Sequence, residues 1–387
     1  MIAERPAHPA AGSDERAAFV EALRDFAARE CGTRAQRDAL TDGDRDTHSQ
    51  SVYDKLAELG WIGCCLPEEY GGAGGTITDA CLRLEETARG MVPIYGVGTS
   101  LIVAHAVERF GTEEQKRSIV GGVCRGEVVS IAMSEPEAGS DVAALRCRAE
   151  RVDGGYLING QKTWISNAHH AARTLVVCRT DREGGKHDGL SMLDVPAGTP
   201  GVVVHPIPTM AGREVNDVFF EDCFVPDEAL VGAPGAGWKQ LMAGLNFERL
   251  VTAAIILGAG QRAFDDALSF VREREQFGRA IGSFQVIKHR VADLATELEC
   301  CRLLTYDVAR RAEERPDVQL PREASMAKLK ITETAKRVAI EGMQMMGGYG
   351  YATEYDMEHH LRTVIISTVY AGTSEIQREI IGKTYGL

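Results

Sequence analysis

The sequence predicts an α+β protein of several domains, with helices first, a β-domain in the middle and a helical bundle at the end. Apolar residues recur at helical spacing in the first part of the chain. Near Val129 the pattern changes to short runs rich in β-branched and aromatic residues, and long helical patterns return after residue 236. We therefore expect an N-terminal helical domain at residues 1–128, a central β-barrel or sandwich domain at 129–236, and a C-terminal four-helix bundle at 237–387.

The N-terminal domain is predicted from the spacing of its apolar residues. Phe19, Leu23 and Phe26 fall on one face of a helix, and a second series of this kind ends at Gly60. The segment Thr112-Glu-Glu-Gln115 has the spacing of a capping box, in which the first and last side chains bind each other's backbone N–H groups. This spacing predicts the start of another helix.

The central domain consists of short apolar runs separated by turn signals. TLVVC and DVFFEDCFVP are runs of this kind. Asp153-Gly154 and Asn159-Gly160 are dipeptides that favour tight turns, so we expect the chain to reverse at both. Pro226 and the following VGAPGAG stretch mark the end of the domain.

Four helical segments are expected in the C-terminal domain. Three of them lie within residues 253–271, 284–311 and 322–346. The fourth follows the stretch TVYAGTSEIQREIIGK, where Ser374 and Gln377 have capping-box spacing. We therefore expect Ser374 to cap a helix whose first N–H groups are free to meet an anion.

Composition and charge exclude several classes of protein. The net charge of −13 argues against nucleic acid or an anionic membrane as the main partner. We see no apolar run that approaches the length of a membrane span, and the N-terminal lead-in has no hydrophobic signal core. The expectation is a cytoplasmic protein with no membrane span.

Cysteine and histidine positions do not indicate a metal site. The ten cysteines form two adjacent pairs, Cys64-Cys65 and Cys300-Cys301, and six scattered single residues, with no CxxC motif. We expect free buried thiols in a reducing compartment. The pairs His169-His170 and His359-His360 have no acidic or Cys companion at ligand spacing, so we interpret them as surface or substrate-channel residues and expect no metal.

Two short stretches of the central domain have the chemistry of a binding site. In SEPEAGSD, Gly139 and Ser140 form a turn whose N–H groups and hydroxyl could hold a phosphate, although such a turn is more often only a turn. In QKTWISN, Trp164 and Ser166 alternate onto one face of a strand, where the indole could wall a planar ring and the hydroxyl could bind its edge. The alternative is a half-buried Trp in a sheet.

Two stretches of the C-terminal domain are also candidates. QMMGGYGY, residues 344–351, is rich in glycine but follows a helix, so it is not a Rossmann-type dinucleotide fingerprint. The alternative interpretation is that its glycines end the preceding helix. In REREQFGRAIGSFQ, Arg274 could pair with a phosphate, or the segment could be a solvated charged turn.

Five motifs in this order resemble the acyl-CoA dehydrogenase family over nearly the whole chain: AMSEPEAGSD, QKTWISNA, RxQFG, QMMGGYGY and AGTSEIQR. The resemblance implies that FAD binds between the β-domain and the C-terminal bundle. It implies that Met133, Ser134, Gly139 and Ser140 line the flavin and pyrophosphate, and that Trp164 and Ser166 lie at the reactive edge of the isoalloxazine. The residues that it implies for the cofactor of a neighbouring subunit are Arg274, Gln285, Gln344, Gly347 and Gly348, and those for the adenosine side are Thr373 and Glu375.

The carboxylate that many relatives carry before the Gly-Thr of the last motif is missing, because this position is Ala371. An alanine cannot act as a base. Glu248, in GLNFERLVTAAIILG, shares a helix face with apolar residues. Apolar surroundings raise the pKa of a carboxylate, which suits a base. The alternative is an ordinary surface Glu that pairs with a cation. NFERL resembles the subset of the family typified by isovaleryl-CoA dehydrogenase, which places its base on this helix. The substrate-side residues implied are Ser140, Asn246, Arg249, Ala371 and Gly372.

The resemblance implies α,β-dehydrogenation of an acyl thioester. Glu248 would take the α-proton while the β-hydride passes to flavin N5, and hydrogen bonds to the thioester carbonyl would stabilise the enolate. The implied substrate is an acyl-CoA or an acyl-carrier-protein thioester, the electron acceptor is an electron-transfer flavoprotein, and the assembly is a homotetramer. The alternatives are a flavin monooxygenase or oxidase with the same fold, and a non-catalytic flavin-binding subunit.

Two features bear on the choice of substrate. With only a methyl group at Ala371, space beside the reacting carbons is widened, so we expect a short branched or ring-bearing acyl group. The chain also departs from the family's ERLxRDAR motif, with Thr363 and Ile365 at positions where relatives carry an acidic and a basic residue. We interpret this departure as a lost structural ion pair.

Overall fold

The computed structural model describes residues 8, 12–181, 183, 185–316 and 318–387. Most of the expected N-terminal lead-in therefore lies outside the described residues. The chain forms two compact units: the first comprises residues 1–39, 76–92 and 249–387, and the second comprises residues 40–75 and 93–248. The element order of helices, then strands, then helices confirms the predicted fold class.

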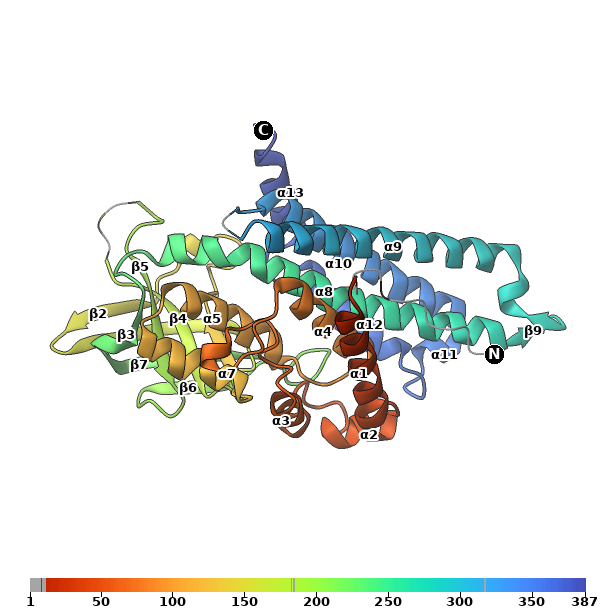
Figure 1. The fold of residues 1–387 in the computed structure, drawn as a ribbon, viewed down its shortest axis with the longest axis horizontal. Helices are drawn as coiled ribbons and strands as arrows, with labels where there is room; N and C mark the ends of the chain where they lie inside the picture. Colours follow the sequence, from red (N-terminus) through yellow and green to blue (C-terminus); the bar gives the residue numbers. More distant parts are fainter. Residues whose placement is uncertain (1–7, 9–11, 182, 184, 317) are drawn as a thin grey trace. The chain divides into compact units, whose positions relative to one another are not determined.

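The first unit is helical. Its elements are α1 (Asp14–Cys31), α2 (Arg34–Leu40), α4 (Ile77–Arg89), residues 249–273 of α8 (Gly237–Glu273), α9 (Gln285–Glu314), α10 (Pro321–Met346), α11 (Gly348–Tyr351), α12 (Met357–Ile365) and α13 (Ser374–Lys383), with a hairpin of β9 (Glu275–Gln276) and β10 (Arg279–Ala280). Helix α4 packs against α1 and α9, and α10 packs against α9, α12 and α13 (Figure 1). This arrangement buries the apolar faces that the periodicity predicted.

Glycines let α8 approach two other helices of the first unit closely. A Cβ atom on Gly258 would lie 2.0 Å from the carbonyl oxygen of Glu85 in α4. A Cβ atom on Gly260 would lie 3.0 Å from the Cβ of Ala335 in α10. Backbone contacts of this kind leave no room for a larger side chain at Gly258.

A buried carboxylate joins α4 to α9. Glu85 accepts hydrogen bonds from the Tyr306 hydroxyl at 2.7 Å and from Nε of Arg302 at 3.2 Å, and its Oε2 lies 3.1 Å from Nε2 of His8. Burial raises the pKa of Glu85, but the hydrogen bond with His8 and the charge of Arg302 outweigh burial and hold this pKa below its ordinary value. The ionised carboxylate therefore stabilises the folded unit.

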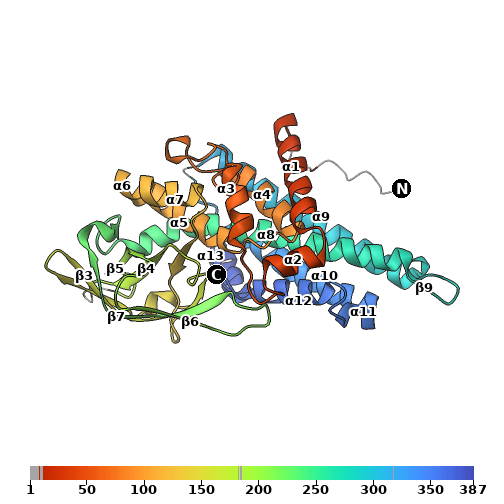
Figure 2. The same cartoon turned by 90° about the horizontal axis from the view of Figure 1, so that it is seen from below.

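The second unit combines one sheet with short helices. Its helices are α3 (Gln50–Glu58), α5 (Gly96–Phe110), α6 (Glu113–Gln115) and α7 (Gly121–Cys124), and residues 237–248 of α8 also belong to it. Its strands are β1 (Val129–Ala132), β2 (Arg148–Val152), β3 (Gly155–Ser166), β4 (Arg173–Arg179), β5 (Leu190–Pro196), β6 (Val202–Pro206), β7 (Val215–Pro226) and β8 (Leu230–Val231). The strand order is β6-β7-β3-β2-β4-β5-β8, with β1 parallel to β4. Figure 2 shows this sheet with β3, β4, β5, β6 and β7 labelled.

The two predicted turns of this unit have different outcomes. Asp153-Gly154 joins β2 to β3, with Val152 paired to Gly155, as expected. The prediction of a turn at Asn159-Gly160 is wrong, because β3 runs through both residues with a register shift against β7 between Ile158 and Gly160. A Cβ atom on Gly160 would lie 2.8 Å from the Cα of Cys147, so this glycine allows a close backbone approach at a bulge.

Helix α8 corrects another expectation. An 18-residue window of this helix has a mean hydropathy of 1.4, so an apolar run does reach the length of a membrane span. Of that window, 56% is buried inside the structure, and a core helix of a soluble protein passes the same test of length and composition. We therefore describe α8 as a buried core helix.

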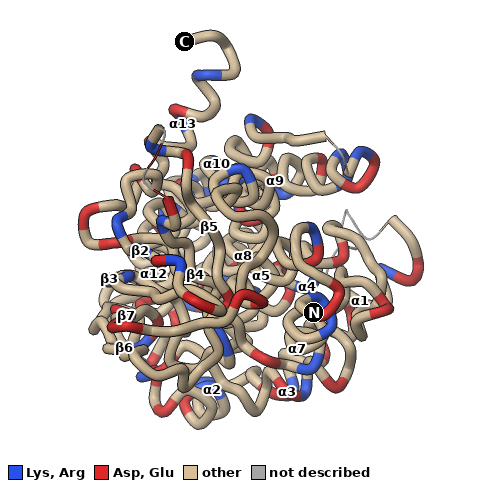
Figure 3. The backbone as a smooth tube through the Cα atoms, turned by 90° about the vertical axis from the view of Figure 1, so that its left-hand side faces the viewer, with Lys and Arg blue, Asp and Glu red and all other residues tan. Residues whose placement is uncertain are grey.

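The thiols largely follow the sequence prediction, and the charged side chains are distributed along the chain. All ten cysteines are free, but Cys300 is exposed and Cys65 is only partly buried, so the expectation of burial is wrong at these two positions. Acidic and basic positions are interspersed along the backbone that Figure 3 shows. Many of them pair, as Arg24 does with Glu86 at 2.7 Å.

Candidate active site

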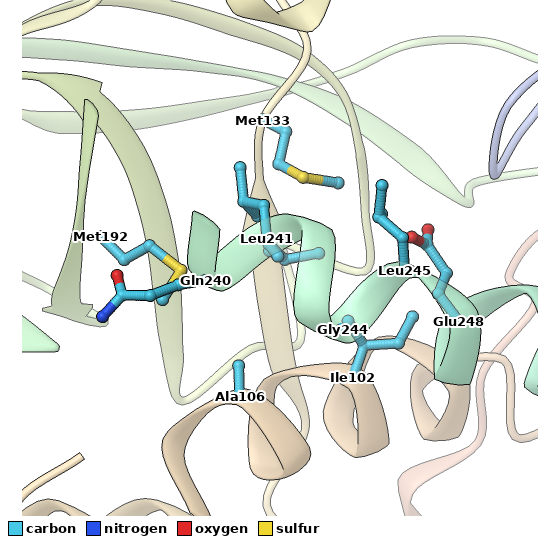
Figure 4. Close-up of a pocket in the computed structure, with 10 residues that line it drawn as sticks. Ile102, Ala106, Met133, Met192, Gln240, Leu241, Gly244, Leu245 and Glu248 are labelled. Carbon is cyan, nitrogen blue, oxygen red and sulfur yellow. The ribbon is translucent and has the colours of Figure 1, made fainter. Parts of the chain in front are cut away.

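A small apolar cavity lies in the second unit, lined by residues of α5, α8 and the strands β1 and β5 (Figure 4). The lining residues are Ile102, Ala106, Ile131, Met133, Met192, Gln240, Leu241, Gly244, Leu245 and Glu248. Its volume of about 20 Å³ has room for only one or two water molecules. An acyl group therefore fits only if flexible lining side chains such as Met133 and Met192 move aside.

Glu248 is the one acidic side chain among the described residues that line this cavity. It lies one helical turn after Gly244, so both residues belong to the same face of α8. In Figure 4 the Glu248 carboxylate lies beside Leu245, and Met133 lies on the side of α8 to which Leu241 and Leu245 point. The sequence prediction placed Glu248 on an apolar face of its helix together with Gly244, and both residues line the cavity.

The residue before Glu248 anchors this part of α8 to α5. The ring of Phe247 stacks on His105, with ring centroids 4.5 Å apart and an interplanar angle of 12°. Burial, and then the charge of Arg109, lower the pKa of His105 to about 4. The imidazole is therefore neutral at neutral pH and adds no positive charge beside the cavity.

Met133 is held by a buried ion pair that the sequence reasoning missed. Lys162 donates to the Met133 carbonyl at 3.0 Å and to Oε1 of Glu135 at 2.8 Å. Glu135 also accepts from the backbone N–H groups of Arg146 at 2.6 Å and Cys147 at 2.9 Å. Both Glu135 and Lys162 occur in motifs quoted above, but only the fold, which brings the segment after β1 beside β3, shows what they do.

The structure places Trp164 beside the segment that follows β1. Thr163 donates its backbone N–H to the Ser134 carbonyl at 2.9 Å, and Ser130 donates its hydroxyl to the Ser166 carbonyl at 2.8 Å. Trp164 is 61% exposed and has a φ of 60°, an unusual conformation for a bulky residue. An exposed indole held in a strained conformation is typical of a functional site rather than of a sheet interior.

The predicted phosphate turn is also exposed. Gly139 and Ser140 lie on the surface, and a Cβ atom at Gly139 would meet nothing within 4 Å. The turn is closed before them by reciprocal backbone hydrogen bonds between Glu135 and Ala138, at 3.1 and 3.0 Å. The backbone at Gly139 and Ser140, after the closed turn, is therefore accessible to a ligand.

The start of α13 corrects one assignment. The side chain that caps this helix is Thr373, which accepts from the N–H of Ile376, so the expectation that Ser374 is the cap is wrong. Thr373 has the extended backbone that a capping residue needs, whereas Ser374 is already in the first turn, where its buried Oγ has no hydrogen-bond partner among the described residues. Glu375 is exposed in the same turn.

The Ala371-Gly372 turn is fixed by two side chains that sequence reasoning did not assign to it. Both residues have positive φ, 53° at Ala371 and 80° at Gly372. Nε2 of Gln377 donates to the carbonyls of Ala371 at 2.9 Å and Gly372 at 3.0 Å, and Nζ of Lys328 donates to the Gly372 carbonyl at 2.8 Å. Gln377 is therefore a clamp for this turn. The sequence feature that could have identified Lys328 is its position on an otherwise apolar face of the helix.

The remaining predicted cofactor residues lie in the first unit. Arg274 lies over the ring of Tyr349, 5.2 Å from its centroid. Helix α10 ends at Met346 and is capped by Gly347, which has a φ of 61°, so the interpretation of QMMGGYGY as a helix end is confirmed for residues 344–347. Residues 348–351 form the short helix α11. Gln285 is exposed at the start of α9, and Gln344, Gly347 and Gly348 are exposed at the end of α10.

The predicted substrate residues Asn246 and Arg249 flank Glu248 on α8, and Arg249 is buried. The interpretation of the histidine pairs as surface or channel residues is wrong for His360, which is buried and lies 2.7 Å from Asp266 through its Nε2. The sequence could not show this pair, because the two residues come from different helices.

These features define a class of protein: an enzyme with a carboxylate in an apolar cavity, an exposed indole and several exposed glycine turns. Family models described as the N-terminal, middle and C-terminal domains of acyl-CoA dehydrogenase match residues 13–127, 130–223 and 235–386. The chain therefore belongs to the acyl-CoA dehydrogenase family, whose members are FAD-dependent enzymes that dehydrogenate acyl thioesters.

Individual relatives agree over almost the full length. A mitochondrial isovaleryl-CoA dehydrogenase from Arabidopsis thaliana is 37% identical over 379 residues, which cover 96% of this chain and 91% of the relative. The crystal structure of an acyl-CoA dehydrogenase from Geobacillus kaustophilus is 34% identical, with a TM-score of 0.91 over 97% of this chain and 99% of that chain. A prolyl acyl carrier protein oxidase is 29% identical, with a TM-score of 0.90 over 97% of this chain and 100% of that chain.

Residues of this chain fit FAD in both units. In the second unit, the exposed indole of Trp164 offers a wall for a planar ring, and the open turn at Gly139 offers N–H groups for a phosphate. In the first unit, the N-terminus of the ten-residue helix α13 carries the buried Oγ of Ser374, which has no described partner. A helix N-terminus with an unused hydroxyl is suited to a polar or anionic group.

Proposed function

We propose that this enzyme removes the α-proton of its acyl thioester with Glu248. The observation that carries the proposal is that Glu248 supplies the one carboxylate among the described residues lining an apolar cavity. A carboxylate in apolar surroundings is a stronger base than one in water, because the charged form is poorly solvated there. Ala371 cannot take this role, and the Gln377 clamp fixes the turn that contains it.

FAD, when bound, supplies the hydride acceptor for the β-carbon. Trp164, Ser166, Met133 and Ser134 would hold the ring system, and Gly139 with Ser140 would hold the pyrophosphate. An acyl group that fills the cavity would displace water from around Glu248, so that the proton goes to the carboxylate and not to solvent. The other cofactor residues proposed are Arg274, Gln285, Gln344, Gly347, Gly348, Thr373 and Glu375, and the other substrate residues are Asn246, Arg249 and Gly372.

We propose a short branched or ring-bearing acyl group as the preferred substrate, on coenzyme A or on a carrier protein. The methyl group at Ala371 supports this choice, as does the similarity to a relative named isovaleryl-CoA dehydrogenase. Comparison of kcat/KM across isovaleryl, isobutyryl, 2-methylbutyryl, butyryl, hexanoyl and palmitoyl thioesters tests it. A straight-chain substrate that leads by tenfold would contradict the proposal.

We propose a homotetramer that works in the cytoplasm and passes electrons to an electron-transfer flavoprotein. Exposed apolar side chains near the residues assigned to a neighbouring cofactor support assembly, namely Phe277, Val286 and Tyr351. The free thiols support a reducing compartment. Light scattering of FAD-loaded protein tests the assembly, and a stable monomer with full FAD content would refute it.

The role of Glu248 is tested with Glu248→Gln. This variant should keep its FAD but slow anaerobic bleaching of the flavin by an acyl thioester by at least about a hundredfold. Glu273→Gln, at the other end of α8, is the matched control and should bleach at the normal rate. Bleaching within tenfold of the normal rate in Glu248→Gln would mean that another group is the base.

A further inference from the structure

Asp46, His169 and His170 meet in the second unit, although Asp46 is more than a hundred residues from the histidines in sequence. Oδ2 of Asp46 lies 2.9 Å from Nε2 of His170 and 3.6 Å from Nε2 of His169. One ligand atom from each of the three residues lies within 4.8 Å of the other two. The tertiary fold therefore supplies the acidic companion that sequence spacing around the histidine pair did not show.

We propose that Asp46, His169 and His170 bind a divalent ion of the zinc class, with one coordination position left for water. Zinc binds imidazole nitrogen and carboxylate oxygen at about 2.0–2.2 Å, so tetrahedral ligand atoms are ~3.3 Å apart. The two distances to Asp46 lie on either side of this value. The ligand atoms of the two histidines lie within 4.8 Å of each other, so they would approach by up to about 1.5 Å to reach this spacing. The proposal does not depend on the function proposed for Glu248.

The backbone around the three ligands holds them in place. The Asp46 carboxylate uses Oδ1 to accept the N–H of His48 at 3.0 Å, which leaves Oδ2 turned to the histidines. The N–H groups of His170 and Ala171 both donate to the Asn167 carbonyl, at 2.9 and 3.0 Å. The two histidines therefore sit on a tight turn and not on a free loop.

The exposure of the ligands suits an ion that exchanges with solvent on one side. The His169 side chain is only 5% exposed, and its Nε2 has no hydrogen-bond partner among the described residues. The side chains of Asp46 and His170 are partly exposed, which leaves an open side for water. A buried ring nitrogen without a partner is costly unless something binds it.

Asn216 provides the outer contact that a metal-binding histidine needs. Its Nδ2 lies 3.0 Å from Nδ1 of His169 and donates to the Ile165 carbonyl at 3.0 Å, and its Oδ1 is buried without a partner. Ligation through Nε2 puts the proton on Nδ1, and a half-turn of the amide would bring Oδ1 to accept it. The half-turn gives up the two contacts that Nδ2 makes now, to the Ile165 carbonyl and to Nδ1 of His169, and it turns Oδ1 toward the Ile165 carbonyl, so ion binding has to offset this cost.

A bound ion would clamp residues 45–48 to the turn at 167–170. The first segment also contacts the loop between β6 and β7, because the Arg213 N–H donates to the Arg45 carbonyl at 2.7 Å. An ion that binds only the folded state raises the free energy of unfolding by RT ln(1 + [ion]/Kd), so the gain grows with the logarithm of the ion concentration. We therefore expect the ion to be structural, with thermal stability as its readout.

The test is zinc titration of untagged, FAD-loaded protein after treatment with a chelator, followed by isothermal calorimetry. Wild type should bind one Zn²⁺ per chain and unfold at a higher temperature with zinc. Asp46→Asn, His169→Gln and His170→Gln should each weaken binding at least tenfold and lose the thermal shift. His359→Gln, which changes the other histidine pair, is the matched control and should bind as wild type does.

Asn216→Asp gives a second, independent test, because a carboxylate accepts the Nδ1 proton better than an amide and should tighten zinc binding by about tenfold. His170 is partly exposed, so its replacement should fold even if the buried variants do not. The proposal is overturned if wild type binds no zinc below ~100 µM. It is equally overturned if His170→Gln retains the wild-type affinity and stoichiometry.

Discussion

Replacement of Lys162 by methionine tests how much the buried ion pair beneath Met133 contributes to stability. Lys162 is fully buried and Glu135 is 8% exposed, and their atoms are 2.8 Å apart. Methionine fills nearly the same volume but leaves the Glu135 carboxylate with no cation. Breaking a buried pair in this way costs about 3–5 kcal/mol, because an uncompensated charge stays in a medium of low polarity.

A matched pair on the surface of the same unit provides the control. Lys186 and Asp141 are 3.2 Å apart, and both side chains are largely exposed. Lys186→Met should change the free energy of unfolding by less than about 1 kcal/mol, since water solvates the remaining carboxylate. The two variants remove the same charge, so their difference measures the effect of burial.

Scanning calorimetry and urea unfolding of FAD-loaded protein provide the assay. A loss of 3–5 kcal/mol corresponds to a fall in Tm of roughly 6–20 °C for a unit of this size. The double variant Glu135→Gln with Lys162→Met should lose less than the sum of the two single losses, by about 1 kcal/mol or more. If Lys162→Met costs no more than Lys186→Met, the reasoning about the buried pair is wrong.

Three further predictions concern the first unit. Gly258→Ala should destabilise by roughly 1–3 kcal/mol because its Cβ would lie 2.0 Å from a backbone oxygen of α4, whereas Gly382→Ala, with nothing within 4 Å, should be neutral or stabilising in thermal unfolding. Thr373→Ala should cost about 1 kcal/mol in the same assay through loss of the α13 cap, and no loss would mean that the cap is unimportant. Because the pKa of Glu85 is below its ordinary value of 4.5, the unfolded chain takes up this proton first, and stability is lost as pH falls below about 4.5. Glu85→Gln should therefore show a smaller fall in Tm between about pH 6 and pH 3.5 than wild type, and an equal fall would exclude Glu85 as a cause of acid sensitivity.

Helix caps and tight turns could be predicted from the sequence where they depend on a few neighbouring residues. The capping box at Thr112 and Gln115 is present with both of its hydrogen bonds, and the turn at Asp153-Gly154 joins two strands as predicted. A prediction from the sequence is wrong where a distant segment overrides the turn preference of the local residues. Asn159-Gly160 has the composition of a turn, but the neighbouring strand β7 pairs along both sides of it and keeps the chain extended.

Some residues of the candidate site could be predicted from the sequence, and others could not. Glu248 and Met133 were predicted from motifs, and the structure places both in the lining of one cavity. The roles of Lys162 and Gln377 were not predicted, although both residues occur within motifs quoted from the sequence. Gln377 binds backbone carbonyls, which every residue has, so no residue type marks its partner in advance. Lys162 binds the Glu135 carboxylate and the Met133 carbonyl, and these lie 27 and 29 residues away in sequence.

The sequence by itself determined the order of helical and β regions, the family and the residues that carry its motifs. These follow from apolar periodicity, from turn and cap preferences that act over a few residues, and from motif order. Only the tertiary structure decided that Asp46 meets His170 and that Glu85 meets Tyr306, pairs separated by 124 and 221 residues. Chain closure over such distances depends on how whole helices and strands pack, and that packing is a property of the complete chain rather than of any short segment.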